Sequence, residues 1–257
     1  MHPDAPFSFG GIGFSIVFMK HVRAILACAA ILMGVPAWAE DPPVPLAEPV
    51  SVSGFRLGMT LEEFRATLYP DRNRADARAF CSGDPLPSGR ERFFNVEPDS
   101  TLKGTGIIIC RFYAPRIDNH VTYWDETGLT IGKAGPLPTA FLFTPTTDDP
   151  ATSHRLFRIS VRAYVSDYDA LIEELRRRYG PPHWISNDHV ESAAGRSYDD
   201  PGYIWENSKS QVVFTKRVMR VELSRVTFSD RTLLRVMGRL LHSQKLPDNS
   251  IDASQAH

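Results

Sequence analysis

The side chains best suited to chemistry gather in one polar stretch of the C-terminal half. His183, Asp188, His189 and Glu191 supply imidazole and carboxylate groups, which Zn²⁺ and similar cations use as ligands in proteins. Their spacing matches neither the HExxH nor the CxxC pattern of metal sites. Solvated side chains of a long polar connection, residues 185–202, explain the same pattern. We favour this second interpretation and keep a metal-dependent enzyme or hydrolase of the cell envelope as an alternative function.

The cysteines indicate a structural bond rather than a reactive centre. Cys28 lies in an N-terminal segment that we expect to be removed, which leaves Cys81 and Cys110. An even number of cysteines in an exported protein is typical of a disulfide, so we predict a bond between these two. A reactive thiol is the alternative, but no CxxC spacing supports it. A lipid anchor on Cys28 is disfavoured because little apolar chain precedes that residue.

Other motifs of catalysis are missing from the sequence. The G-x-S-x-G elbow of serine hydrolases does not occur after residue 39. Gly104–Gly106 and Gly132–Gly135 lack the Lys-Ser/Thr pair of a phosphate-binding loop. We therefore expect no cofactor. The formal net charge of the chain is −1, which does not favour nucleic acid as a partner.

Two tryptophans are candidates for a protein contact. Trp124 and Trp184 are flanked by polar residues, and exposed tryptophans commonly anchor a partner protein. Burial in the core is the alternative interpretation, and it is the more usual fate of an aromatic side chain.

The first 39 residues have the organisation of a secretory signal peptide. Lys20, His21 and Arg23 form a basic region, and residues 24–35 form an apolar run that is too short to span a bilayer. Ala37-Trp38-Ala39 has the small-x-small pattern of a cleavage site. We predict cleavage after Ala39 and a periplasmic location.

The remaining boundaries follow from composition. Met19 directly precedes the basic residues, so it is an alternative start to Met1. Residues 40–49 are rich in proline and predict an extended tether, whereas residues 247–257 predict a polar, frayed tail. The folded domain is expected over residues 50–246, and no segment in it is long and apolar enough to cross a membrane.

The clearest structural pattern covers residues 156–182. Apolar residues alternate with polar ones over residues 157–165, which predicts a strand with one buried face. Ser166, with Asp169 three residues later, predicts a capped helix. Gly180 and the two prolines after it end that helix.

Two further helices are predicted on either side of this unit. Thr60 and Glu63 have the spacing of a capping box, and Ser229 precedes a last apolar-periodic stretch. The order of helix, strands, helix, hairpin, strand and helix predicts an α+β fold with a mainly antiparallel sheet and about three helices on one face. Since the first two helices share a plan, we also consider two diverged similar units, residues 50–150 and 151–246.

Two stretches resemble a known group of exported bacterial domains. They are Leu57–Phe64 (LGMTLEEF) and the run from Leu175 to Tyr179-Gly180-Pro181-Pro182. Both are similar to parts of the SmpA/OmlA type of outer-membrane assembly lipoprotein and of the related β-lactamase-inhibitor-like fold. In this chain the two halves of that signature lie on different helices. The resemblance implies helices over an antiparallel sheet, and a protein that binds other proteins rather than one that catalyses a reaction.

These observations lead to one main functional hypothesis. We expect a periplasmic, non-catalytic protein that binds another protein of the cell envelope. A small-molecule binder, with its pocket between the sheet and the helices, is a further alternative.

Overall fold

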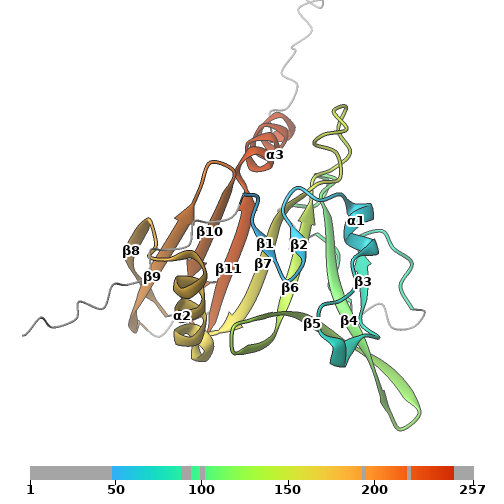
Figure 1. Ribbon diagram of the computed structural model, residues 1–257, viewed down its shortest axis with the longest axis horizontal. Coiled ribbons are helices and arrows are strands. Elements are labelled where there is room, and N and C mark those ends of the chain that lie inside the picture. The colour runs from blue at the N-terminus through green and yellow to red at the C-terminus, as the bar shows by residue number, and fades with distance from the viewer. Residues whose placement is uncertain (1–47, 88–93, 99–101, 193–194, 219–220, 246–257) are drawn as a thin grey trace, which may run out of the picture. The chain divides into compact units, whose positions relative to one another are not determined.

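A nine-stranded antiparallel sheet organises the part of the chain that the structure describes (Figure 1). The computed structural model describes residues 48–87, 94–98, 102–192, 195–218 and 221–245. The strand order is β3-β4-β5-β6-β7-β11-β10-β9-β8, and the first residues of β4 also pair with β6. The strands are β3 (Arg78–Cys81), β4 (Ile108–Asp118), β5 (Val121–Ile131), β6 (Ala134–Phe143), β7 (Leu156–Tyr164), β8 (Trp184–Glu191), β9 (Ser197–Glu206), β10 (Ser210–Thr215) and β11 (Leu223–Asp230).

The remaining elements are a small ribbon and the helices. Within the described ranges, a two-stranded ribbon precedes the large sheet, and three α-helices and two 3₁₀ turns connect or follow its strands. They are β1 (Ser51–Val52), β2 (Phe55–Arg56), α1 (Leu61–Ala66), η1 (Arg72–Arg74), η3 (Val165–Asp167), α2 (Tyr168–Tyr179) and α3 (Arg231–Lys245). The antiparallel sheet predicted from the sequence is therefore present.

Helices α1 and α2 cover one face of the sheet, which we call the covered face. Phe64 of α1 and Leu171 and Leu175 of α2 belong to the same apolar core as Phe141 and Phe214 of the strands. All five side chains are at most 1% exposed. Burial at that level accounts for about 1.5–3 kcal/mol per large side chain, so this core is the main source of stability.

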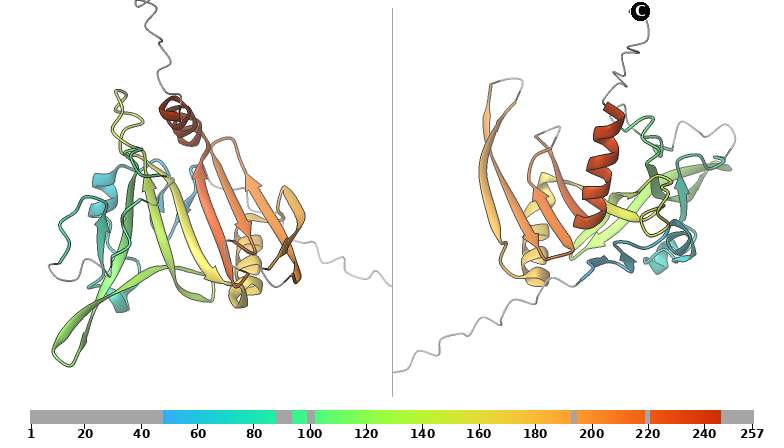
Figure 2. Two further views of the ribbon diagram at one scale, coloured as in Figure 1. Left: turned by 180° about the vertical axis from the view of Figure 1, so that it is seen from behind. Right: turned by 90° about the horizontal axis from the view of Figure 1, so that it is seen from above.

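Helix α3 packs on the opposite face, which we call the open face, and this corrects the prediction that all three helices share one face. Leu233 and Met237 of α3 contact a second apolar cluster that includes Ile109 and Leu142. These strand residues alternate with Cys110, Phe141 and Phe143 of the first core, so they point to the other side of the sheet. Figure 2 shows α3 on the side of the sheet away from α2.

The helix ends show where local sequence was sufficient. Thr60 Oγ1 accepts the amide of Glu63 at 3.0 Å, and Glu63 Oε2 accepts the amide of Thr60 at 2.6 Å, so the predicted capping box is confirmed. Ser166 does not cap α2, because η3 occupies residues 165–167 and α2 begins at Tyr168.

The cap of α3 also differs from the prediction. Asp230 Oδ1 accepts the amides of Thr232 and Leu233 at 2.8 and 2.9 Å, whereas Ser229 is buried as the penultimate residue of β11. The strand therefore continues one residue past the predicted cap.

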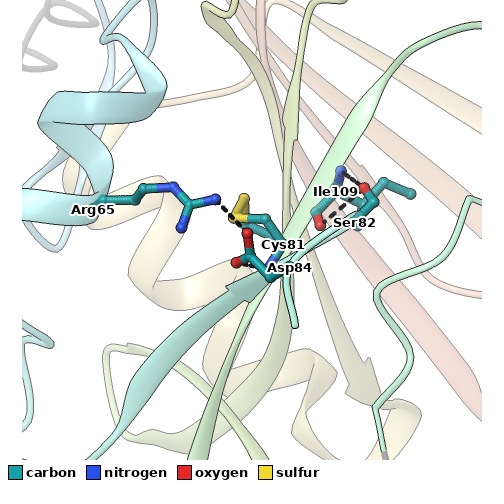
Figure 3. Close-up of a disulfide and its surroundings, with 6 residues drawn as sticks. Arg65, Cys81, Ser82, Asp84 and Ile109 are labelled. Carbon is teal, nitrogen blue, oxygen red and sulfur yellow. Dashed lines mark hydrogen bonds and ion pairs between the residues drawn. A yellow bond between two sulfur atoms is a disulfide. The ribbon is translucent and has the colours of Figure 1, made fainter. Parts of the chain in front are cut away.

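The predicted disulfide is confirmed. Cys81 and Cys110 face each other across β3 and β4 and are bonded. Asp84 accepts the amide of Cys81 at 2.9 Å and pairs with Arg65 of α1 at 2.8 Å, as Figure 3 shows. The edge strand β3 is thus tied both to the sheet and to α1.

Candidate functional site

The open face carries a cluster of three arginines at the centre of the sheet. Arg162 of β7 lies directly opposite Arg225 of β11. Arg158 lies on β7 as well, four residues before Arg162, with Ser160 midway between them. Residues i and i+2 of a strand point to the same side, so the three side chains share one surface. We call Arg158, Arg162 and Arg225 the arginine cluster.

Burial distinguishes the two faces of the same strands. On the covered face, Ile159, Val161, Val226 and Phe228 are at most 1% exposed. On the open face, the arginine cluster, Ser160 and Thr227 are all half-buried. Neighbouring side chains of the sheet therefore shield the open face in part, while α3 covers only the end near Phe157.

A β-bulge aligns the arginine cluster with the open face. Leu142 pairs with Arg158, but the next residue of β6, Phe143, pairs with Leu156. Phe157 is therefore an extra residue, and such a residue disrupts the alternation of a strand locally. Leu156 belongs to the covered core, whereas Phe157 packs under α3. The Arg158 guanidinium lies 5.8 Å from the centre of the Phe157 ring.

The arginines of this cluster are partly buried and lie close to one another, and both conditions lower pKa values. Burial, and secondly the nearby Arg225, lowers the pKa of Arg158. Burial, and secondly Arg162, lowers the pKa of Arg225. Nε of Arg158 is buried and has no hydrogen-bond partner among the residues that the structure describes. The fold thus holds positive charge on this face at a cost, because its surroundings disfavour the charged form.

One carboxylate lies beside the arginine cluster. Glu126 of β5 accepts Arg111 at 2.7 Å and Arg162 at 3.4 Å. It thereby shares its single negative charge between two guanidiniums. Guanidinium groups bind carboxylates and phosphates through two parallel hydrogen bonds, so the cluster suits an anionic group of a partner.

A hollow of about 700 Å³ lies next to the arginine cluster. Arg162 forms one side, and Pro136, Pro138, Tyr164 and Leu223 supply apolar surface. Tyr164 is 66% exposed. Asp167 and Glu222 also line this hollow. An apolar side chain of a partner could enter here beside an anion bound to the arginines.

The four predicted metal ligands lie along or beside one strand rather than around a cation. Residues 184–191 form β8, paired with β9, so the predicted polar connection over 185–202 is wrong. Asp188 alternates with His189 and Glu191 and therefore points to the other face. His189 Nδ1 pairs with Asp199 at 3.0 Å, and His183 Nδ1 accepts the amide of Glu206 at 3.1 Å. In the described part of the chain, no three His, Cys, Asp or Glu residues are placed to hold a metal ion.

The two tryptophans differ in their surroundings. Trp184 is 58% exposed on the edge strand β8. It belongs to a row of paired residues that crosses the open face through Ile204, Val213 and Thr227 to Ser160. Trp124 instead packs in an aromatic cluster, 5.4 Å from Phe80 between ring centres, together with Phe94 and Tyr113.

The arginine cluster is not apparent from the sequence pattern alone. The alternation of residues 157–165 predicts one buried face, and Arg158 and Arg162 lie half-buried on the opposite, open face. Their relation to Arg225 depends on the pairing of β7 with β11, about sixty residues later in the chain. The sequence pattern that could predict the cluster is the recurrence of arginine at outward positions of two otherwise apolar strands.

Comparisons with known proteins returned no relative: no protein-family model, no curated protein and no solved structure matches the chain. Within the described residues, none of the helices combines the length and the hydrophobicity needed to cross a bilayer.

Proposed function

We propose that the protein is an exported, non-catalytic binding protein whose open sheet face contacts another protein of the cell envelope. The observation that carries this proposal is the half-buried arginine cluster, in which like charges are kept together on a face that α3 covers only at one end. Fold stability alone gives no reason for such an arrangement, whereas binding of a carboxylate does.

The surroundings of the cluster define the chemistry of the partner. The arginines suit an anionic group, which in a protein partner is a carboxylate, the hollow beside Arg162 accepts an apolar side chain, and Trp184 adds an exposed aromatic surface on the same face. We therefore expect an acidic protein segment that carries at least one large apolar residue. Aromatic and arginine side chains are the residue types that dominate binding energy at protein interfaces.

Three further observations support export and binding. The disulfide suits an oxidising compartment such as the periplasm, and the first 39 residues have the pattern of a signal peptide. The resemblance to envelope domains points the same way.

Site-specific photo-crosslinking in intact cells tests the proposed interface. A crosslinker at Thr227, in the centre of the open face, should capture one envelope protein, while a crosslinker at Glu173, exposed on α2, should not. The captured protein should bind the purified chain more weakly at high salt. Capture from both positions alike, or from neither, would contradict the proposal.

A matched pair of variants then examines the arginines themselves. Arg158→Met keeps most of the aliphatic stem and removes the charge, so affinity should fall by about tenfold or more. Arg177→Met removes an arginine from α2 on the covered side and should leave affinity unchanged. Equal affinity of both variants would exclude the arginine cluster as the binding surface.

A further inference from the structure

A second candidate site lies at the C-terminal end of α1, on the other side of the sheet from the arginine cluster. A cavity of about 470 Å³ opens between this helix end, η1 and β3. Its floor includes Phe112, a residue of the covered face. The volume falls in the range of about 300–1,000 Å³ that is usual for small-molecule sites.

The inner wall of the cavity is apolar. The Tyr69 hydroxyl donates to the carbonyl of Gly128 at 2.6 Å and lies 2.9 Å from Thr127 Oγ1. Its hydrogen-bonding capacity is thus used, and only its ring remains for the cavity, 5.0 Å from the Phe112 ring between centres. Leu68, at the rim, is 88% exposed. A ligand with an apolar body would cover this leucine.

The rim of the cavity is cationic. Arg65, Arg72 and Arg78 line it, and none of the lining residues is acidic. Arg65 is held by Asp84 at 2.8 Å. Within the described residues, Arg72 and Arg78 take part in no ion pair. Two guanidiniums therefore remain to meet an anionic group at the edge of an apolar wall.

We propose that this cavity binds a small anionic amphiphile, that is, a carboxylate or sulfate head group on a short alkyl or aromatic body. The head group pairs with Arg72 and Arg78, and the body lies along Tyr69, Phe112 and Leu68. This site is independent of the protein-binding face, since the two share no residue. Each can fail without the other.

Calorimetry with the full mature chain and three ligands of equal chain length tests the proposal. Decanoate should bind in stoichiometric amount, while decanol and decyltrimethylammonium should bind at least about tenfold more weakly because they lack the negative charge. Vesicles of anionic phospholipid separate a soluble amphiphile from a membrane surface. Binding to vesicles without binding to free decanoate would overturn the proposal, as would equal affinity for decanol.

Variants on η1 and its C-cap locate the site. Arg72→Gln should weaken decanoate binding by about five- to tenfold, whereas Arg74→Gln, on the same turn but not in the cavity lining, should not change it. Ala75 is exposed and has helical backbone angles, so Ala75→Trp should fold and fill the opening, and binding should be lost. Circular dichroism checks that each variant is folded. Binding that survives Ala75→Trp, or that falls equally in both arginine variants, would place the ligand elsewhere.

Discussion

At the scale of single residues, the charge of Arg158 serves the proposed binding but lowers the stability of the fold. Burial and the nearby Arg225 disfavour its charge, which lowers its pKa and costs folding free energy. We predict that Arg158→Met raises the free energy of unfolding by about 0.5–1 kcal/mol, because the charge is removed while the stem still packs on Phe157. Urea denaturation measures this change.

The control for that prediction is an exposed arginine on another element. Arg235 is exposed on α3, and Arg235→Met should change stability by less than about 0.5 kcal/mol. If Arg158→Met instead clearly lowers the free energy of unfolding, the arginine cluster has a structural role. Its charge then does not reduce stability in favour of binding.

Four buried tyrosines set an upper pH limit to the stability of the fold. Burial is the main cause that raises the pKa of Tyr69, Tyr113, Tyr168 and Tyr179 above the ordinary value of 10.0. A raised folded pKa means that the stabilising contribution is complete below pH 10 and is lost as the pH rises through the folded value. We predict that these tyrosines ionise together with unfolding.

The measurement combines phenolate absorbance with far-ultraviolet circular dichroism during an alkaline titration. The chain has eight tyrosines. Ionisation of all eight while the circular dichroism stays native would show that burial does not protect these four.

At the scale of elements, the cap of α3 is a separable contribution. Asp230 accepts two amides of the first turn, so Asp230→Ala should cost about 1 kcal/mol. Amide hydrogen exchange should become faster over residues 231–241, where Leu233 and Met237 are the buried side chains of α3. Ser229→Ala, at the cap expected from the sequence, should leave exchange in α3 unchanged. Faster exchange in Ser229→Ala but not in Asp230→Ala would show that Ser229 is the cap.

The disulfide is the second element-scale contribution. Cys81 and Cys110 are 29 residues apart, and a closed loop of that length stabilises by about 3–4 kcal/mol in the chain-entropy model. Replacing both residues by alanine should lower the free energy of unfolding by that amount. Reductant should destabilise the wild type to the same extent and leave the double variant unaffected. A smaller effect of reductant would mean that the bond is inaccessible.

Elements were predictable from sequence where the deciding contacts are local. The Thr60 capping box and the hairpin of β9 and β10 depend on residues a few positions apart, and both are present. The strand β8 was missed because its burial pattern is almost entirely exposed, so alternation gives no signal. The side on which α3 packs could not be derived, since it depends on which strand residues form the second apolar cluster. The arginine cluster was hidden for the same reason, because pairing of β7 with β11 creates it.

At the scale of the whole molecule, one arrangement occurs twice. Helix α1 is followed by the strands β3 to β6, and α2 by β8 to β11, each set in antiparallel order. Strand β7 lies between the two sets and pairs with the last strand of each. This order is compatible with the two similar units considered from the sequence, residues 50–150 and 151–246, and duplication remains a hypothesis.

The shared core predicts that these units do not fold separately. Phe141 and Phe143 of the first unit belong to the same cluster as Leu156 and Ile159 of the second. We expect a fragment of residues 50–150 to lack a cooperative thermal transition, because its β6 edge and apolar face lose their cover. Mixing with residues 151–246 should restore the transition. A fragment that unfolds cooperatively alone would show that each unit has a sufficient core.

The bulge at Phe157 has a consequence for how this gene can tolerate length changes. Loss of one residue from a strand normally inverts every side chain beyond it. If the codon for Phe157 is deleted, Leu156 and Arg158 become neighbours in the chain. Their partners, Phe143 and Leu142, are already neighbours, so the ladder becomes regular. The ladder beyond that point, with its guanidiniums, would stay in phase, and only the aromatic contact beneath α3 would disappear. Deletion of Ser160, three positions later, has no such compensation and should prevent folding.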